Sequence, residues 1–199
     1  MEKGPGVTET YAIRFKSDVR VPMRDGVRLS ADIYLPDAAG PFPTVLMRTP
    51  YDNNADVMIR KGRRLANEGY ACVIQDCRGR FDSEGSFYPF VNEGPDGFDT
   101  QEWIGQQPWS NGRIGMAGAS YLGQVQWTSA PLRSQYLTCL APRVMAADLF
   151  RGLNYPGGAL QLNVLMTWGN DFARHPDFST REVIASESKA AHEIYLRGI

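Results

Sequence analysis

A serine lies in the short segment Gly118-Ala119-Ser120-Tyr121-Leu122-Gly123. The apolar run before it predicts a strand and the pattern after it predicts a helix, so Ser120 is expected on a sharp strand-to-helix turn. Such a turn projects the serine hydroxyl from the carboxyl edge of a sheet. The backbone N–H of the next residue then lies at the positive end of a helix, where it can hold an oxyanion. This placement suits the nucleophile of an acyl-transfer reaction.

Two observations count against a simple reading of this segment. A serine that only caps the amino end of a helix would produce a similar pattern. The usual nucleophile turn is also Gly-x-Ser-x-Gly, whereas here Leu122 occupies the second glycine position and Gly123 follows one place later.

A nucleophilic serine needs a base to take its proton and an acid to orient that base. The chain has two histidines, His175 and His192, both after Ser120. Both fall in a tail that reads as helical, with no intervening strand to carry the acid. We expect His175 to be a solvated loop residue and His192 to lie on a helix surface, and neither to be the base.

Composition excludes several classes of function. The 199 residues are 43% hydrophobic and 22% charged, with a formal net charge of −1, as in an ordinary globular domain. A nucleic-acid binder would show a basic excess, so a small neutral substrate is favoured over a polyanion. The start of the chain lacks an apolar signal region, and no run is long enough for a membrane span. These features predict a cytoplasmic protein that binds neither membrane nor nucleic acid.

The chain has three cysteines, an odd number, and they lack the spacing of a metal site: Cys72, Cys77 and Cys139. We therefore expect them to be buried, reduced thiols. The acidic loop from Asp76 to Gly85 lacks the ligand spacing of a known calcium loop. No metal and no cofactor are therefore expected.

The elements that must position Ser120 follow from hydrophobic periodicity. Thr10–Arg20 and Val27–Leu35, separated by a turn at Gly26, predict an antiparallel hairpin at a sheet edge. The expected buried strands are Thr44–Met47, Ala71–Asp76, Arg113–Ala117 and Leu137–Ala141. The expected helices are Ala55–Asn67 (with Val57, Ile59, Leu65 and Ala66 facing inward), Phe98–Gln106 and Tyr121–Ala130.

Short apolar strands that alternate with helices are typical of parallel βαβ units, and the edge hairpin makes the sheet mixed. The fold class predicted is α/β. From Asp148 onward, Leu153–Phe172 and Arg181–Leu196 look helical, with breaks at Gly157-Gly158 and His175-Pro176. This tail predicts the start of a cap over the sheet.

Several segments together resemble one family, the cocaine esterase and X-Pro dipeptidyl-peptidase group of α/β-hydrolases, and within it the bacterial cocaine esterases. The group also includes α-amino acid ester hydrolases and glutaryl acylases. Besides the Gly-x-Ser-Tyr-x-Gly turn, the segments that carry the resemblance are Val21–Leu29, Arg48-Thr49-Pro50-Tyr51-Asp52, Gln75–Arg80 with Ser83-Glu84-Gly85, and Trp109–Met116. They occur in the family's order and cover about the first 170 residues.

The resemblance implies roles for three further residues. Tyr51 matches the tyrosine whose hydroxyl donates to the oxyanion, together with the backbone N–H of Tyr121. A phenol suits this role because it is a donor that stays neutral near pH 7. Trp168 falls where the family has a tryptophan that faces the acyl pocket.

The same resemblance implies that part of the fold lies beyond residue 199. The family's acid and histidine follow the cap helices, and a further jelly-roll-like domain comes later. We therefore expect residues 1–147 to be the amino-terminal part of an α/β-hydrolase core, incomplete at its carboxyl end, and 148–199 the start of a helical cap. An incomplete sheet would leave an open edge, which favours self-association.

The functional prediction is a serine hydrolase that cleaves carboxylic ester or amide bonds through an acyl-enzyme on Ser120. Esterase is preferred, because a peptidase or amino-ester hydrolase would need an acidic cluster to bind an amine. X-Pro dipeptidyl-peptidase and α-amino acid ester hydrolase stay open as alternatives within the family. A non-catalytic truncated fragment or assembly partner is the alternative from another class, and a split enzyme is a third.

Overall fold

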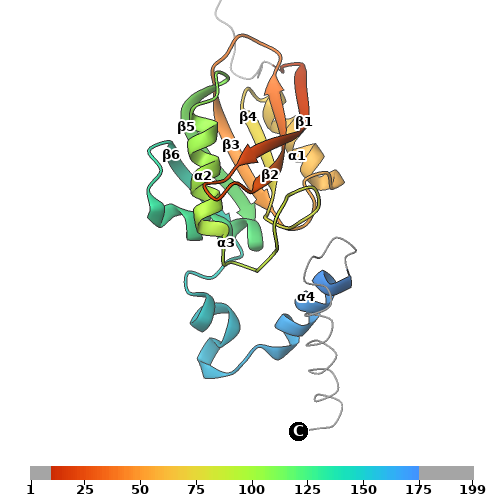
Figure 1. Ribbon diagram of the computed structural model, residues 1–199, viewed down its shortest axis with the longest axis vertical. Helices are drawn as coiled ribbons and strands as arrows, with labels where there is room; N and C mark the ends of the chain where they lie inside the picture. Colours follow the sequence, from red (N-terminus) through yellow and green to blue (C-terminus); the bar gives the residue numbers. More distant parts are fainter. Residues whose placement is uncertain (1–9, 175–199) are drawn as a thin grey trace, which may run out of the picture.

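The computed structural model describes residues 10–174, and the amino-terminal hairpin forms one edge of its sheet (Figure 1). Strand β1 (Ile13–Pro22) runs antiparallel to β2 (Arg28–Pro36), as predicted. Gly26, in the connecting turn, has a φ of +87°, a conformation that glycine adopts without the clash a Cβ would cause.

The sheet has six strands in the order β1-β2-β4-β3-β5-β6. β2 pairs antiparallel with β4, whereas β4, β3, β5 and β6 run parallel to one another, which confirms the mixed and mostly parallel sheet. The four parallel strands are β3 (Phe42–Thr49), β4 (Ala71–Asp76), β5 (Ser110–Ala119) and β6 (Leu137–Arg143). Among residues 10–174, β6 pairs only with β5 and is the second edge.

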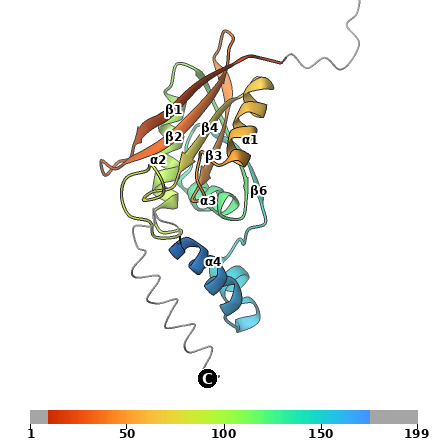
Figure 2. The ribbon, with the colours of Figure 1, turned by 90° about the vertical axis from the view of Figure 1, so that its right-hand side faces the viewer.

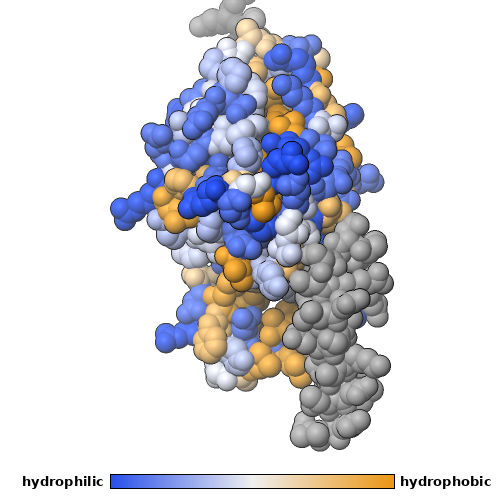
Figure 3. Space-filling view, in the orientation of Figure 1, coloured by the Kyte–Doolittle hydropathy of each residue, from blue (hydrophilic) through white to orange (hydrophobic). Residues whose placement is uncertain are grey.

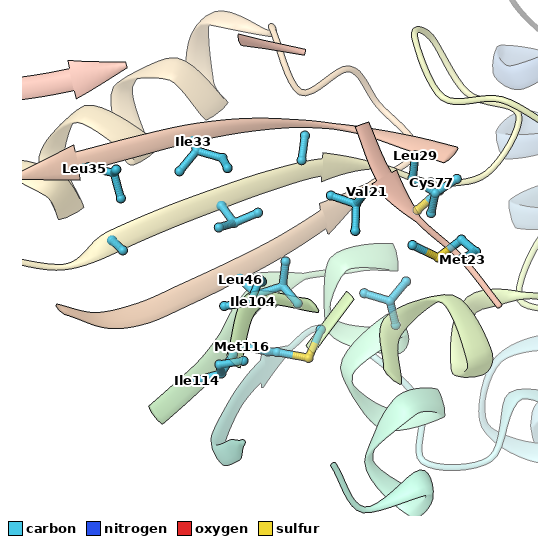
Figure 4. Packing of buried hydrophobic residues seen from close by; sticks show 14 of the residues in the cluster. Val21, Met23, Leu29, Ile33, Leu35, Leu46, Cys77, Ile104, Ile114 and Met116 are labelled. Carbon is cyan, nitrogen blue, oxygen red and sulfur yellow. The ribbon is translucent and has the colours of Figure 1, made fainter. Parts of the chain in front are cut away.

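Apolar residues on both faces of the central strands bury the sheet between helices. Leu46 and Val73 pack in one cluster with residues of α2 (Glu93–Gly105) and α3 (Tyr121–Ser129). Their chain neighbours Met47 and Ile74 point to the opposite face and pack with residues of α1 (Asp56–Asn67). Figure 2 shows α1 and α2 on opposite sides of the sheet, and Figure 4 shows the larger cluster.

Three expectations were wrong in detail. Helix α2 begins at Glu93, not at Phe98. Pro95 is tolerated there because it lies in the first turn, where its missing N–H costs no intrahelical bond. Along α1 the buried positions are Met58, Gly62 and Ala66, at helical spacing. Ala66 and the partly buried Leu65 face inward as expected, whereas Val57 is exposed. Cys72 and Cys77 are buried free thiols, but Cys139 is exposed, on the edge strand.

The segment after β6 holds a π-helical turn, η2 (Leu149–Asn154), and helix α4 (Leu162–Arg174). The break expected at Gly157-Gly158 within 153–172 is confirmed, since both glycines have positive φ and α4 begins after them. Exposed apolar side chains gather on this segment (Figure 3), among them Phe150 and Val164. The segment Arg181–Leu196, also expected to be helical, lies outside the described residues. No helix within 10–174 has the length and apolar character of a membrane span.

Candidate functional site

Ser120 occupies the turn between β5 and α3 in a conformation that L-residues rarely adopt. Its φ is 58° and its ψ is −127°, outside the αR and β regions in which most residues lie. The residue is exposed and makes no capping hydrogen bond to α3, although it stands at the N-cap position. The helix-capping alternative is therefore wrong, and Ser120 projects its hydroxyl from a strained turn.

Backbone hydrogen bonds hold this turn on both sides. The Ser120 N–H donates to the carbonyl of Arg143 at the end of β6 (2.9 Å), which ties the turn to the neighbouring strand. The Ser120 carbonyl accepts the N–H groups of Gly123 (2.8 Å) and Gln124 (3.0 Å). The N–H of Tyr121 is in the first helical turn, where no intrahelical acceptor exists, so it can serve an anion.

The displaced glycine has a packing explanation. A Cβ at Gly123 would lie 2.8 Å from the carbonyl oxygen of Arg143, so glycine lets α3 approach the end of β6. Leu122, in the position of the usual glycine, is buried in the cluster on the face of α1. A Cβ at Gly118 would lie 2.3 Å from the Cβ of Leu122, so the first glycine makes room for that leucine.

The side chain of Tyr121 is buried and anchored below the turn. Its hydroxyl donates to Oε1 of Glu93 (2.7 Å) and accepts the N–H of Phe90 (3.0 Å). Burial and the nearby Glu93 carboxylate raise the pKa of this phenol well above its usual value, so it remains a donor. Because Tyr121 follows Ser120 directly, this anchor fixes the residue whose N–H was predicted to face an oxyanion.

Glu93 belongs to a buried charge network. Its carboxylate lies 2.8 Å from Nη1 of Arg48, and both side chains are almost fully buried. Arg48 also donates to Oε1 of Gln75 (2.8 Å) and to the backbone carbonyl of Glu93 (2.9 Å). Burial alone would lower the pKa of Arg48, but the carboxylates of Glu93 and Asp96 reverse the effect and raise it. Arg48 therefore stays charged beneath the turn that carries Ser120.

Tyr51 lies two residues after β3, and Ser120 directly after β5, the adjacent parallel strand. The carboxyl ends of both strands meet at one edge, which brings the two residues to the same part of the sheet. The rings of Tyr51 and Tyr121 meet edge to face, with centroids 6.4 Å apart. Tyr51 is 39% exposed, so its ring is accessible to a ligand.

Trp168 reaches this edge from α4. Its indole Nε1–H donates to the hydroxyl oxygen of Tyr51 (3.1 Å), and its ring is stacked near Phe90 and Tyr121, with centroids 6.0 Å from each. The indole N–H thus fixes the position of the Tyr51 hydroxyl oxygen by donating a hydrogen bond to it.

The four residues singled out from the sequence, Ser120, Tyr51, Tyr121 and Trp168, thus gather at one edge of the sheet. Their roles remain predictions. His175, expected in a solvated loop, and His192, expected on a helix surface, both lie outside the described residues. Among residues 10–174, no group of three His, Cys, Asp or Glu side chains is placed to hold a metal ion.

Sequence reasoning missed the supporting residues Arg48, Glu93 and Phe90. Arg48 gave one usable signal, since an arginine inside an apolar strand needs a buried counter-charge. Glu93 gave none, because it stood in what read as a Gly-rich, acidic loop. Phe90 has a φ of 67°, which no local pattern indicates.

Comparison with known proteins gives the family. Residues 25–194 match the family described as X-Pro dipeptidyl-peptidase (S15 family). The chain is 48% identical over 158 residues to the cocaine esterase of Rhodococcus sp. (strain MB1 Bresler), covering 76% of this chain and 27% of that protein. It therefore spans about a quarter of that relative's length.

Solved structures of related hydrolases support the same family. A CocE/NonD family hydrolase from Staphylococcus aureus superposes with a TM-score of 0.71 at 26% identity, over 88% of this chain and 36% of that one. An α-amino acid ester hydrolase gives a TM-score of 0.62 at 28% identity, over 81% of this chain and 30% of that one. These likenesses confirm the α/β-hydrolase fold and the resemblance found in the sequence. The chain belongs to the X-Pro dipeptidyl-peptidase (S15) family, whose relatives here are hydrolases.

Proposed function

We propose that the protein hydrolyses carboxylic esters through an acyl-enzyme formed on Ser120. The observation that carries this proposal is the conformation of Ser120, which is exposed, has φ 58°, and caps nothing. Strained backbone of this kind persists only where the surrounding structure enforces it, and it concentrates at reactive residues.

In the proposed reaction, Oγ of Ser120 attacks the substrate carbonyl carbon and its proton passes to a general base. The carbonyl oxygen becomes an oxyanion that accepts hydrogen bonds from the Tyr121 N–H and the Tyr51 hydroxyl. The intermediate collapses when the bond to the leaving alcohol breaks, and the base returns its proton to that alcohol. Water then attacks the acyl-enzyme in the same manner, which releases the acid and restores the serine.

Two features support these assignments of donors. The Tyr121 N–H stands at the amino end of α3, and the residue is anchored through its phenol to Glu93. The Trp168 indole orients the Tyr51 hydroxyl by donating to its oxygen. We also assign the indole ring, which lies beside both tyrosines, to the wall of the acyl pocket.

The general base and its orienting acid come from outside residues 10–174 in this proposal, because that range contains no histidine. The chain covers only about a quarter of the length of the cocaine esterase relative, so a longer protein or a second polypeptide is expected to supply them. A non-catalytic fragment is the competing hypothesis, and the same absence of histidine favours it.

An ester and an amide that share one acyl group test the proposal. With the downstream segment added to supply the base, a p-nitrophenyl ester should give a burst of p-nitrophenol followed by slower turnover, since the acyl-enzyme accumulates. The matching p-nitroanilide should react more slowly. Ser120→Ala should abolish both, and Tyr51→Phe should lower kcat by about 100-fold with little change in KM, the usual cost of losing one oxyanion donor. Ester turnover that persists in folded Ser120→Ala would contradict the proposal.

A further inference from the structure

The loop that follows β4 holds the segment that carries Tyr51. The Cys77 N–H donates to the carbonyl of Thr49 (2.9 Å), where β3 ends. Nε of Arg80 donates to the carbonyl of Pro50 (2.9 Å), and Oδ1 of Asp76 accepts the N–H of Asn53 (2.8 Å). Contacts from the last residue of β4 and from the loop after it therefore hold both flanks of Tyr51.

The segment needs such support because its own backbone is unfavourable. Asp52, the residue after Tyr51, has a φ of 85°, a left-handed conformation that disfavours residues with a Cβ. Residues in such conformations persist only when the surroundings over-determine them. Without its anchors, the segment would relax toward ordinary φ values and carry the Tyr51 hydroxyl with it.

Asp76 and Arg80 are costly groups for a purely structural role. Asp76 is fully buried, and its Oδ2 has no hydrogen-bond partner among the described residues. Burying a carboxyl group with an oxygen unsatisfied is unfavourable, and here burial raises the pKa of Asp76 to about 8. Arg80 is 2% exposed, with its guanidinium carbon 5.0 Å and 5.4 Å from the ring centroids of Phe81 and Phe87.

We propose that Asp76 and Arg80 are positioning residues for Tyr51, which set its hydroxyl at the oxyanion through the backbone of Asn53 and Pro50. The inference deepens the proposed function and rests on it for the role of Tyr51. It adds that the loop after β4 determines the geometry of the oxyanion site, although Asp76 and Arg80 themselves contact no substrate.

Trp168 supplies a reporter of the Tyr51 position that does not depend on activity. Its indole N–H donates to the Tyr51 hydroxyl, so its proton chemical shift follows that oxygen. The chain has four tryptophans and hence four indole signals, and Trp168→Phe identifies the relevant one.

The first experiment records amide exchange and indole shifts of the 199-residue chain by NMR. In Asp76→Ala, exchange of the Asn53 amide should accelerate about tenfold, as loss of one ordinary hydrogen bond predicts, and the Trp168 indole signal should move. Asp76→Asn should preserve both, because its amide oxygen can still accept. The matched control is Glu84→Gln in the same loop, whose carboxylate pairs with Arg28, and it should change neither.

The second experiment is a double-mutant cycle on the rate at which a fluorophosphonate phosphonylates Ser120, with the downstream segment present as the source of the base. Arg80→Lys and Asp76→Ala should each slow labelling about tenfold in the parent chain, but should slow it no further once Tyr51 is replaced by Phe. Arg80→Lys keeps the charge, so it provides the cycle with a folded member if Asp76→Ala does not fold.

The outcomes separate the two proposals. Unchanged Asn53 exchange and indole shift in folded Asp76→Ala would overturn the positioning role, whether or not the chain is active. The positioning role would also be overturned if the effects of Asp76→Ala and Tyr51→Phe on the labelling rate multiplied in the double variant. A parent chain that shows the NMR effects but no labelling, even with the downstream segment present, would count against the proposed function alone.

Discussion

Replacing Asp76 with Asn should stabilise the protein relative to the parent, and the gain should grow as the pH rises. The buried carboxyl group has a pKa of about 8 in the folded chain, against about 3.9 for an unfolded aspartate. Between these values the folded state holds a proton that the unfolded state has released. The stability of the parent should therefore fall as the pH rises through this window, whereas the amide of the Asp76→Asn variant does not titrate there.

The size of the effect follows from linkage. One bound proton changes the free energy of unfolding by up to about 1.4 kcal/mol per pH unit. From about pH 5.5 to 7.5 the variant should gain up to about 3 kcal/mol over the parent, and the gain should level off above the folded pKa. Near about pH 4 and below, the two chains should be close in stability, since a neutral carboxyl and an amide are similar in size and charge.

Urea unfolding at four pH values provides the assay, with the difference between variant and parent as the readout. In this difference, the contributions of other carboxyl groups to the free energy of unfolding cancel, because they are the same in both chains. Asp32, whose pKa burial also raises, is one of these groups. Glu84→Gln serves as the control, because hydrogen bonds from Arg28 lower the pKa of Glu84, so its contribution is lost only as the pH falls below this window. A difference that stays flat from about pH 5.5 to 8.5 would refute the reasoning, since it would mean that Asp76 is ionised throughout.

Three further predictions concern the nucleophile turn and its support. Ser120→Gly should raise the free energy of unfolding by roughly 1 kcal/mol, because glycine accepts the positive φ without strain, and a loss of stability in urea would show that the turn is not strained. Tyr121→Phe should cost about 1–3 kcal/mol, since it removes a partner of both Glu93 and the Phe90 N–H, and an unchanged urea midpoint would show that this anchor contributes nothing. Gly123→Ala should cost about 1–3 kcal/mol by crowding the Arg143 carbonyl, whereas the control Gly169→Ala, whose Cβ meets nothing within 4 Å, should not, and equal thermal melting of the two variants would contradict the packing argument.

The framework of the fold could be predicted because local patterns agree with tertiary burial. β4 spans Ala71–Asp76 as expected, since it is apolar and buried on both faces. The start of α2 could not be predicted, because Gly94, Pro95 and Gly97 have low helix propensity and tertiary packing overrides it. Gly97, for example, leaves room for the side chain of Ser129 in α3.

Some residues of the candidate site could likewise be predicted from the sequence, and others could not. Ser120 could be found because a strand, a turn and a helix meet there within a few residues. Tyr51 and Trp168 needed the family resemblance, since 117 positions separate them and only the fold joins them through one hydrogen bond. The roles inferred for Asp76 and Arg80 could not be predicted at all, because they depend on backbone atoms of a segment that adjoins a different strand.

The central claim is that Ser120 is an activated nucleophile, and intact-mass detection of fluorophosphonate labelling on the purified 199-residue chain tests it most directly. We expect one adduct per chain once a base is available, either from the chain or from an added downstream segment, and no adduct on Ser120→Ala. An adduct that forms equally on the folded Ser120→Ala variant, or none on the folded parent even with the downstream segment present, would contradict it.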